Sequence, residues 1–130
     1  MQIDNVLLDQ LTVQAKESPR LRMNLDLRNS SADTSQRMLN AIEPGSVVPI
    51  HRHRATSETM VVLRGSLVEE YYDDSCNLIA TYELAAGGPI CALNIPAGTW
   101  HTLRAHESGT VILEMKDGAY EPIGEEDVRQ

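Results

Sequence analysis

From residue 36 to residue 116 the chain is a series of short apolar segments separated by tight-turn residues. The separators are Pro44-Gly45, Gly65, Asp73-Asp74-Ser75, Gly87-Gly88-Pro89, Pro96-Ala97-Gly98 and Ser108-Gly109. Many short strands at regular spacing are typical of a β-sandwich or β-barrel, and no helical periodicity competes with this interpretation. The pattern predicts an all-β domain with strands near residues 36–42, 47–53, 58–64, 66–72, 77–84, 90–95, 100–106 and 109–116.

The N-terminal segment follows a different period. Its apolar side chains recur near the 3.6-residue helical repeat, Asp4 can cap the start, and Ser18-Pro19 can end it, which predicts a short α-helix over residues 4–17. Residues 21–27 then alternate between leucine or methionine and polar residues. This is the period of a strand with one apolar and one polar face.

A length of 130 residues suits one domain, so we expect a single domain over residues 1–130 with the barrel over residues 36–116. The formal net charge of -8 would repel a phosphate backbone or an anionic bilayer, which argues against nucleic-acid and membrane partners. The first residues lack the basic region of a secretory signal, and no apolar run is long enough to span a membrane. We therefore expect a cytoplasmic protein.

Three of the four histidines fall in patterns that suit a metal site. His51 and His53 are two residues apart on a predicted strand, so both side chains point to one face. Glu58 opens the next strand, and antiparallel pairing of these two strands would place it beside the histidines. His101 follows the Pro96-Ala97-Gly98 turn, and His106, five residues later, would face the opposite side. Three imidazoles and one carboxylate form a suitable ligand set for a divalent transition metal.

These residues carry a resemblance to the cupin superfamily. Residues 45–65 match the pattern G-x5-H-x-H-x(3,4)-E-x6-G of the first cupin motif at every fixed position, and residues 96–101 match the P-x-G-x-x-H centre of the second. The leading glycine of the second motif is displaced to Gly87 or Gly88, and its closing asparagine is Ala105. The resemblance implies a double-stranded β-helix, or jelly-roll barrel, that holds a metal ion on His51, His53, Glu58 and His101.

A closer resemblance covers almost the whole chain. It is similar to the WbuC-type cupin metalloproteins, which tend to be encoded among surface-polysaccharide (O-antigen) genes and whose reaction is not established. The chain departs from that family at Asn24, Asp26 and Arg28, where histidine and asparagine are usual, so its ligand can differ. The matching stretches are residues 18–20, 36–40, 61–65, 95–102 and 114–120.

Candidate reactive groups near the metal are Glu114, Lys116 and Tyr120. Glu114 and Lys116 share one face of the last predicted strand. That face is either solvated or turned toward the pocket, where Glu114 would transfer protons. Tyr120 is either a pocket hydroxyl or an aromatic plug.

Candidate ligand-binding residues are Arg22, Asn24, Arg37 and Arg64. The polar face that holds Arg22 and Asn24 is either solvated or covers the mouth of the barrel. Arg37 can bind an anionic group. Arg64 lies late on its strand, in phase with Glu58, and is either at the pocket rim or exposed.

Three functions fit these residues. The first is a metalloenzyme with isomerase-like or epimerase-like chemistry on a small polar metabolite such as a sugar or nucleotide-sugar. The second is an Fe(II) dioxygenase, and the third is a non-enzymatic module that binds a sugar or an acid. The residues do not choose among Zn, Fe, Mn and Ni. The apolar face of residues 21–27 also suggests a homodimer.

Overall fold

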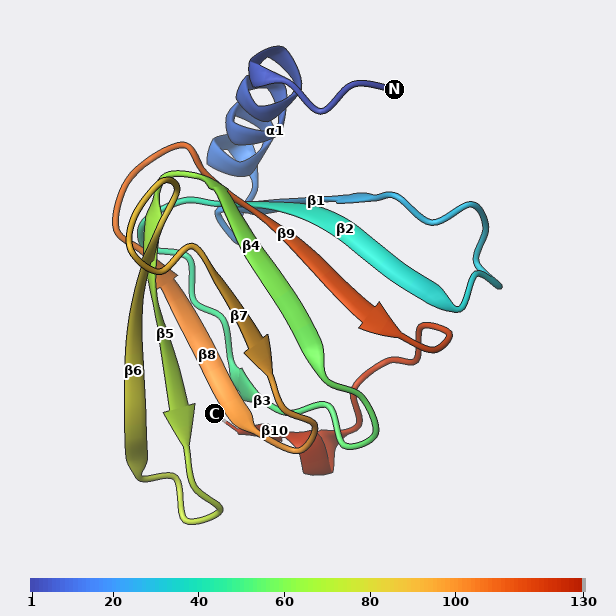
Figure 1. Ribbon diagram of the computed structural model, residues 1–130, viewed down its shortest axis with the longest axis vertical. Coiled ribbons are helices and arrows are strands. Elements are labelled where there is room, and N and C mark those ends of the chain that lie inside the picture. Colours follow the sequence, from blue (N-terminus) through green and yellow to red (C-terminus); the bar gives the residue numbers. More distant parts are fainter. Residues whose placement is uncertain (130) are drawn as a thin grey trace.

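A computed structural model of the chain describes residues 1–129. It contains two five-stranded antiparallel sheets that face each other and one α-helix, α1 (Asn5–Glu17), as Figure 1 shows. A short 3₁₀ helix, η1 (Glu125–Asp127), precedes the last strand. The strand orders are β1-β2-β9-β4-β7 and β10-β3-β8-β5-β6. This confirms the predicted all-β jelly roll with a short N-terminal helix. The strands are β1 (Arg22–Asp26), β2 (Ser35–Ile42), β3 (Ile50–His51), β4 (Glu58–Arg64), β5 (Ser66–Tyr72), β6 (Leu78–Ala85), β7 (Ala92–Ile95), β8 (Trp100–Ala105), β9 (Thr110–Asp117) and β10 (Val128–Arg129).

The core between the sheets is made of aliphatic side chains from both layers. Met60 and Ile112 come from one sheet, and Leu67 and Leu103 come from the other. Burying one such side chain contributes about 1.5–3 kcal/mol. The remaining members of this cluster are Ile42, Val62, Leu84 and Ile95.

Helix α1 covers the outer face of β1, β2 and β9 (Figure 1). The side-chain carboxylate of Asp4 caps it by accepting from the main-chain N–H of Leu7 at 3.0 Å. Leu8 and Leu11 pack against the outer side of this sheet, where the apolar side chains of residues 21–27 also lie. The apolar face that suggested a homodimer is therefore covered, at least in part, within the chain itself.

The opposite face of the same three strands points between the sheets. In antiparallel strands, residues directly opposite each other project to the same face. Met60 and Ile112 lie in the core, so the polar residues aligned with them also face inward. The register aligns them in three rows, Asn24–Asn40–Ile112, Asp26–Met38–Glu114–Met60 and Gln36–Lys116–Glu58.

The histidine strand is shorter than predicted. We expected a strand over residues 47–53, but β3 contains only Ile50 and His51, and His53 lies in the loop that follows. Pro49 has no N–H to donate to a sheet, which explains the late start. The main-chain carbonyl of His53 instead accepts from the N–H of Gly98 at 2.8 Å.

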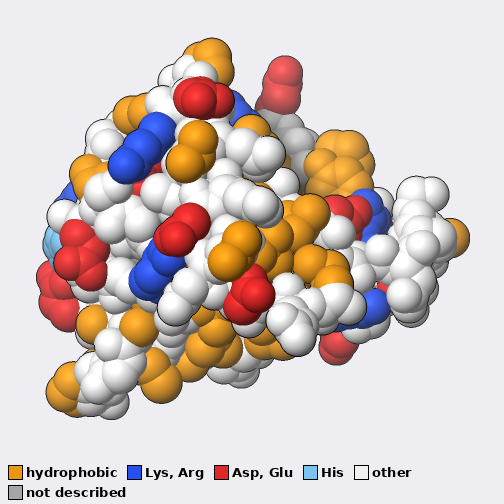
Figure 2. All heavy atoms as spheres, turned by 90° about the horizontal axis from the view of Figure 1, so that it is seen from above, with side chains coloured by type: hydrophobic (Ala, Val, Ile, Leu, Met, Phe, Trp, Pro, Cys, Tyr) orange, Lys and Arg blue, Asp and Glu red, His pale blue; other side chains and the backbone are white. Residues whose placement is uncertain are grey.

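Charged side chains are interspersed over the surface. On the face shown in Figure 2, basic and acidic side chains alternate with apolar ones, and no continuous basic patch is seen on this face. Within residues 1–129, the only helix of appreciable length, α1, is neither long nor apolar enough to cross a bilayer.

Candidate metal centre

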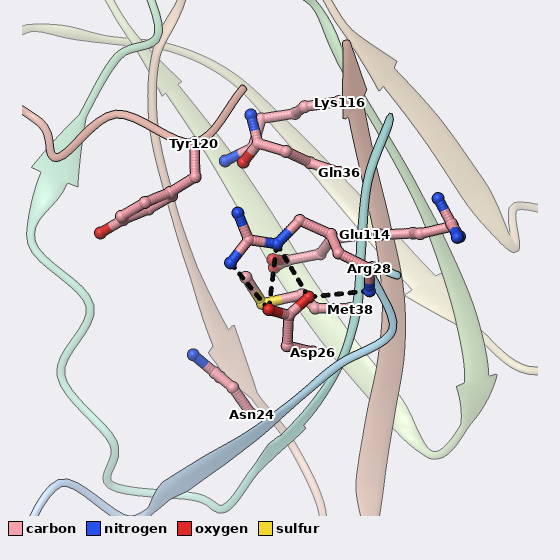
Figure 3. Close-up of a pocket in the computed structure, with 9 residues that line it drawn as sticks. Asn24, Asp26, Arg28, Gln36, Met38, Glu114, Lys116 and Tyr120 are labelled. Carbon is pink, nitrogen blue, oxygen red and sulfur yellow. Dashed lines mark hydrogen bonds and ion pairs between the residues drawn. The ribbon is translucent and has the colours of Figure 1, made fainter. Parts of the chain in front are cut away.

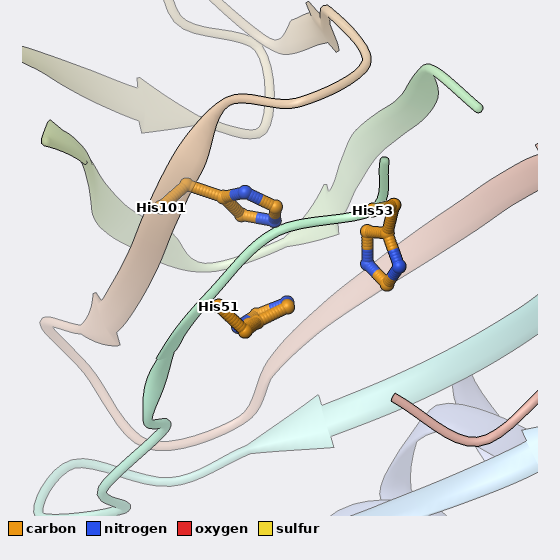
Figure 4. A group of neighbouring side chains, drawn as sticks. All are labelled: His51, His53 and His101. Carbon is orange, nitrogen blue, oxygen red and sulfur yellow. The ribbon is translucent and has the colours of Figure 1, made fainter. Parts of the chain in front are cut away.

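Three histidines converge between the two sheets (Figure 4). His51 on β3 and His101 on β8 are directly opposite each other, with ring centroids 4.3 Å apart. His53 joins them from the loop after β3. One ring nitrogen from each residue lies within 4.8 Å of the other two, so the three side chains can together hold a metal ion.

Hydrogen bonds to the main chain set the tautomers of two of these imidazoles. Nδ1 of His51 lies 2.8 Å from the carbonyl oxygen of Pro49, and Nδ1 of His101 lies 2.8 Å from that of Thr99. A carbonyl oxygen only accepts, so each Nδ1 carries the proton and each Nε2 keeps a free lone pair. This is the arrangement that metal-binding histidines use.

Burial favours the neutral form of His51 and His53. It lowers the pKa of His51 to about 4, and the adjacent His101 adds to this effect. Burial likewise lowers the pKa of His53 to about 4, with the positive charge of Lys116 as the next cause. Neutral imidazoles are the protonation state that binds metal.

Glu58 places a carboxylate next to the three histidines. Its Oε2 lies 3.5 Å from Nε2 of His53 and 3.4 Å from Nε2 of His101. This oxygen is buried and has no hydrogen-bond partner within residues 1–129. Metal–ligand bonds of about 2.0–2.2 Å place neighbouring donors roughly 3–3.5 Å apart. The spacing and the unpartnered oxygen therefore fit a metal ion.

Glu58 is also ionised. Burial raises its pKa, but the neighbouring His101 and the charge of Lys116 outweigh that effect and bring the pKa to about 2. A buried carboxylate is stabilised by nearby positive charge, which Lys116 supplies in part and a bound metal ion would supply further.

The strand arrangement differs from the one expected for Glu58. The antiparallel pairing considered for the His51 and Glu58 strands does not occur, because β3 pairs with β8 and β10 whereas β4 pairs with β7 and β9. Glu58 therefore approaches the histidines from the opposite sheet. The cluster spans the interior of the jelly roll instead of lying on one sheet.

Figure 3 shows a cavity whose lining residues are mostly polar or charged. We call it the inner chamber; its volume is about 200 Å³. Lys116 and Gln36 lie at one end of it and Asn24 at the other. Nζ of Lys116 is 3.5 Å from Nε2 of His53, so this end of the cavity borders the histidine cluster. The lining residues are Asn24, Asp26, Arg28, Gln36, Arg37, Met38, Glu114, Lys116 and Tyr120.

The charges within the inner chamber are partly paired. Arg28 donates to both carboxylate oxygens of Asp26, at 3.0 and 2.7 Å, and its guanidinium lies 5.6 Å from the ring centre of Tyr120. Burial raises the pKa of Glu114 to about 7, and the negative charge of Glu58 adds to this rise. A pKa in this range suits a group that exchanges protons near neutral pH.

A second, larger cavity lies at the mouth of the barrel, and we call it the outer cleft. It has a volume of about 500 Å³ and is lined by residues 52–56, 116–124, Gln36 and Asp127. Gln36, Lys116 and Tyr120 line both cavities. The two spaces are thus neighbours that meet next to His53.

Most of the arginines predicted to bind a ligand make structural contacts instead. Arg22 donates to the carbonyl oxygen of Val47 at 2.8 Å and does not line the inner chamber. Arg37 does line it, but its guanidinium donates to the carbonyl oxygen of Ser35 at 2.8 Å. Arg64 lies outside both cavities and contacts helix α1. His106 forms an ion pair with Glu83 at 2.6 Å and does not belong to the histidine cluster.

One buried acid has no counterpart among the predicted residues. Glu69 on β5 is fully buried, and neither of its carboxylate oxygens has a hydrogen-bond partner within residues 1–129. Burial raises its pKa to about 9, and the charges of Glu58 and Glu114 add to the rise. The sequence Leu67-Val-Glu69-Glu-Tyr-Tyr72 places one aliphatic residue, one glutamate and one tyrosine on each face. Both glutamates are buried, and periodicity could not reveal which of them faces the core between the sheets.

Residues 3–84 match a protein family described as a domain of unknown function, DUF6016. This range contains His51, His53 and Glu58 and ends before His101. No curated protein matches the chain.

Solved structures share the fold at low sequence identity. CapF in complex with the inhibitor 3-isopropenyl-tropolone has a TM-score of 0.65 and 19% identity over 76% of this chain and 28% of its own length. KdgF from Halomonas sp. has a TM-score of 0.62 and 16% identity over 79% of this chain and 84% of its own. Recombinant oxalate oxidase in complex with glycolate has a TM-score of 0.63 and 17% identity over 82% of this chain and 56% of its own.

These neighbours have the cupin fold, and at such identities the likeness concerns the fold alone. The chain spans less than a third of CapF and little more than half of oxalate oxidase. The family match covers more than half of the chain. The chain therefore belongs to the family described as a domain of unknown function, DUF6016, and folds as a cupin.

Proposed function

We propose that this protein binds one divalent transition-metal ion on His51, His53, Glu58 and His101 and is an enzyme that acts on a small polar metabolite in the inner chamber. The observation that carries the proposal is the buried, unpartnered Oε2 of Glu58, at 3.4–3.5 Å from two imidazole nitrogens. Three nitrogen donors and one oxygen donor suit Zn, Fe, Mn or Ni and leave coordination positions for a ligand. Such an ion polarises a carbonyl or hydroxyl oxygen that binds to it.

The lining of the inner chamber favours a hydroxyl-rich ligand. Asn24 and Gln36 offer amide donors and acceptors, Lys116 offers a cation, and Tyr120 offers a ring that is 57% exposed. Closely placed donors and acceptors can bind neighbouring hydroxyl groups, while an aromatic ring packs on the apolar face of a sugar. The outer cleft next to Lys116 has room for a larger substituent. We therefore infer a sugar or nucleotide-sugar as the ligand.

Glu114 is the residue that would move a proton. It lines the chamber, and its pKa of about 7 allows it to accept and return a proton at neutral pH. A general acid–base group of this kind is most effective when its pKa is near the working pH. This favours isomerase-like or epimerase-like chemistry.

The wider role is inferred from resemblance. The chain resembles the WbuC-type cupins, and CapF of Staphylococcus aureus, which has the same fold, is described as a capsular polysaccharide assembling protein. We propose a role in surface-polysaccharide metabolism in the cytoplasm.

The outer edge of β1 remains free of a strand partner within residues 1–129, and we propose that it contributes to a homodimer. Light scattering coupled to size-exclusion chromatography tests the dimer.

The proposal is tested by metal analysis followed by turnover. Protein purified without added metal should contain one transition-metal ion per chain, and the His53→Ala variant should contain none. Equal metal content in the two proteins would contradict the ligand set. Candidate sugars and nucleotide-sugars are then assayed for conversion. Binding without conversion would instead identify a non-enzymatic module, and oxygen consumption by an iron-loaded sample would identify a dioxygenase.

A further inference from the structure

The last strand of the structure lies directly beside the histidine strand. In β10, Val128 is opposite His51 and Arg129 is opposite Ile50. The main-chain N–H of Arg52 also donates to the carbonyl oxygen of Asp127 at 3.0 Å. On its other side, β3 pairs with β8 at the single position His51–His101. The C-terminal residues thus provide much of the main-chain support for the segment that carries His51 and His53.

One carboxylate binds the two arginines on either side of His53. Oδ1 of Asp127 accepts from Nε of Arg52 at 2.8 Å and from Nε of Arg54 at 2.6 Å. The side chain of Asp127 is only 14% exposed, whereas that of Arg54 is 56% exposed. Charge-assisted hydrogen bonds of this length are among the stronger ones in proteins. They fix both residues that flank His53, although none of the three side chains belongs to the donor set.

The same residues reach the strand of the third histidine through Trp100. The guanidinium carbons of Arg52 and Arg129 lie 4.5 and 3.8 Å from its ring centre. Its indole N–H donates to Oδ1 of Asp74 at 3.1 Å. Arg129 also donates to the carbonyl oxygen of Asp73 at 2.8 Å and to that of Asp74. Because Trp100 precedes His101 directly, this stack joins β10, the loop after β3 and β8 beside the three histidines.

We propose that this C-terminal clamp, defined as Arg52, Arg54, Trp100, Asp127 and Arg129, positions the three histidines and so sets the metal affinity. The inference rests on the proposed function. His53 has no strand of its own, and the clamp restricts the loop that carries it. Without Asp127 the two arginines lose their shared counter-charge, and the ion would have to order the loop as it binds.

Two variants separate positioning from simple charge effects. Arg54→Gln removes a positive charge near the site, which by electrostatics alone would raise the affinity for a cation. Loss of positioning instead lowers it, so the two explanations predict opposite signs. We expect the Kd for Co²⁺ to rise about threefold in Arg54→Gln and about tenfold in Asp127→Asn, as for other residues that orient metal ligands. The fluorescence of Trp100, the only tryptophan, should change in both variants.

The matched control is Glu125→Gln, which makes the same charge change two residues from Asp127 and should alter the Kd less than twofold. Calorimetric titration of the full chain with Co²⁺ gives the affinities of the wild type and of these three variants, and His53→Ala is included as a variant that should not bind. Because Arg54 is largely exposed, its variant keeps the test valid if Asp127→Asn folds poorly. Unchanged or tighter binding by Arg54→Gln overturns the clamp while the ligand set stands. Absence of Co²⁺ binding by the wild type overturns both proposals.

Discussion

Lys116 and Glu58 are directly opposite each other on β9 and β4, so an ammonium and a carboxylate project together into the interior of the jelly roll. The ammonium nitrogen also lies 3.5 Å from Nε2 of His53. Lys116 therefore occupies the side of the histidine cluster that borders the inner chamber. It offers a positive charge both to the proposed metal ligands and to the metabolite proposed for the inner chamber.

This position predicts that Lys116 opposes metal binding. Lys116→Met removes a cation beside His53 with little change in volume, so the affinity for Co²⁺ should increase, by about tenfold, since nearby like charges repel strongly in a partly buried site. Isothermal titration at constant pH measures the effect. Lys16→Met, on the exposed face of α1, is the matched control and should leave the affinity unchanged. A weaker affinity in Lys116→Met would show that the ammonium supports the site.

Glu114 is predicted to be needed for turnover and not for metal content. Glu114→Gln keeps the size of the side chain but cannot exchange a proton, so conversion of the substrate should fall by roughly 10²–10⁴-fold. The metal content, measured by mass spectrometry of the elements, should remain that of the wild type. Loss of the metal together with activity would mean that Glu114 acts on the ion site itself.

The buried acid Glu69 predicts a pH dependence of stability. Its pKa of about 9 in the folded state lies above the ordinary value of 4.5, so the folded state holds a proton that the unfolded state releases. Stability then falls as pH rises from about 4.5 to 9, by up to ~1.4 kcal/mol per pH unit. Between pH 7 and 9 the shift of Glu114 adds little, because its pKa is about 7.

The comparison is made on metal-free protein by urea unfolding at pH 7, 8 and 9. Wild type should lose stability over this range, whereas Glu69→Gln, which has no proton to release, should lose much less. Glu107→Gln, at an exposed position in the turn between β8 and β9, provides the control. Equal slopes for wild type and Glu69→Gln would show that Glu69 already ionises at neutral pH.

Arg64 is predicted to be structural. Its guanidinium donates to Asp9, to Thr12 and to the carbonyl oxygen of Gly109, at 2.7, 3.0 and 2.9 Å. Arg64→Ala should therefore lower the free energy of unfolding by about 1–2 kcal/mol, as expected when several hydrogen bonds of a charged group are lost. The Kd for Co²⁺ should not change. A changed Kd with unchanged stability would return Arg64 to the candidate ligand-binding residues.

Much of this architecture follows from local pattern. The helix is observed at Asn5–Glu17 against a prediction of 4–17, and β4 and β5 have the predicted bounds of 58–64 and 66–72. Such elements are identifiable because period and turn chemistry act within a few residues. The spacing of His51, His53, Glu58 and His101 likewise pointed to one cluster, although the assignment of these residues as ligands remains a prediction.

The sequence does not show what each face of a strand packs against. Alternation shows that Asn24 and Asp26 share a face, but it does not show which face points inward; that depends on helix α1 covering the leucine side. For the same reason, the sequence did not show whether the face that holds Glu114 and Lys116 points to solvent or into the pocket. Strand β10 was not predicted because a two-residue strand has no periodicity, and its pairing with β3 is a long-range contact.

The pairing of β10 with the histidine segment has a practical consequence for preparing the protein. A purification tag fused after residue 130 would begin one residue beyond a strand that is hydrogen-bonded beside His51. The N-terminus lies beyond helix α1, at the other end of the view in Figure 1. Samples for elemental analysis are therefore best expressed with a cleavable N-terminal tag, so that the recovered occupancy reflects the native protein and not the fusion.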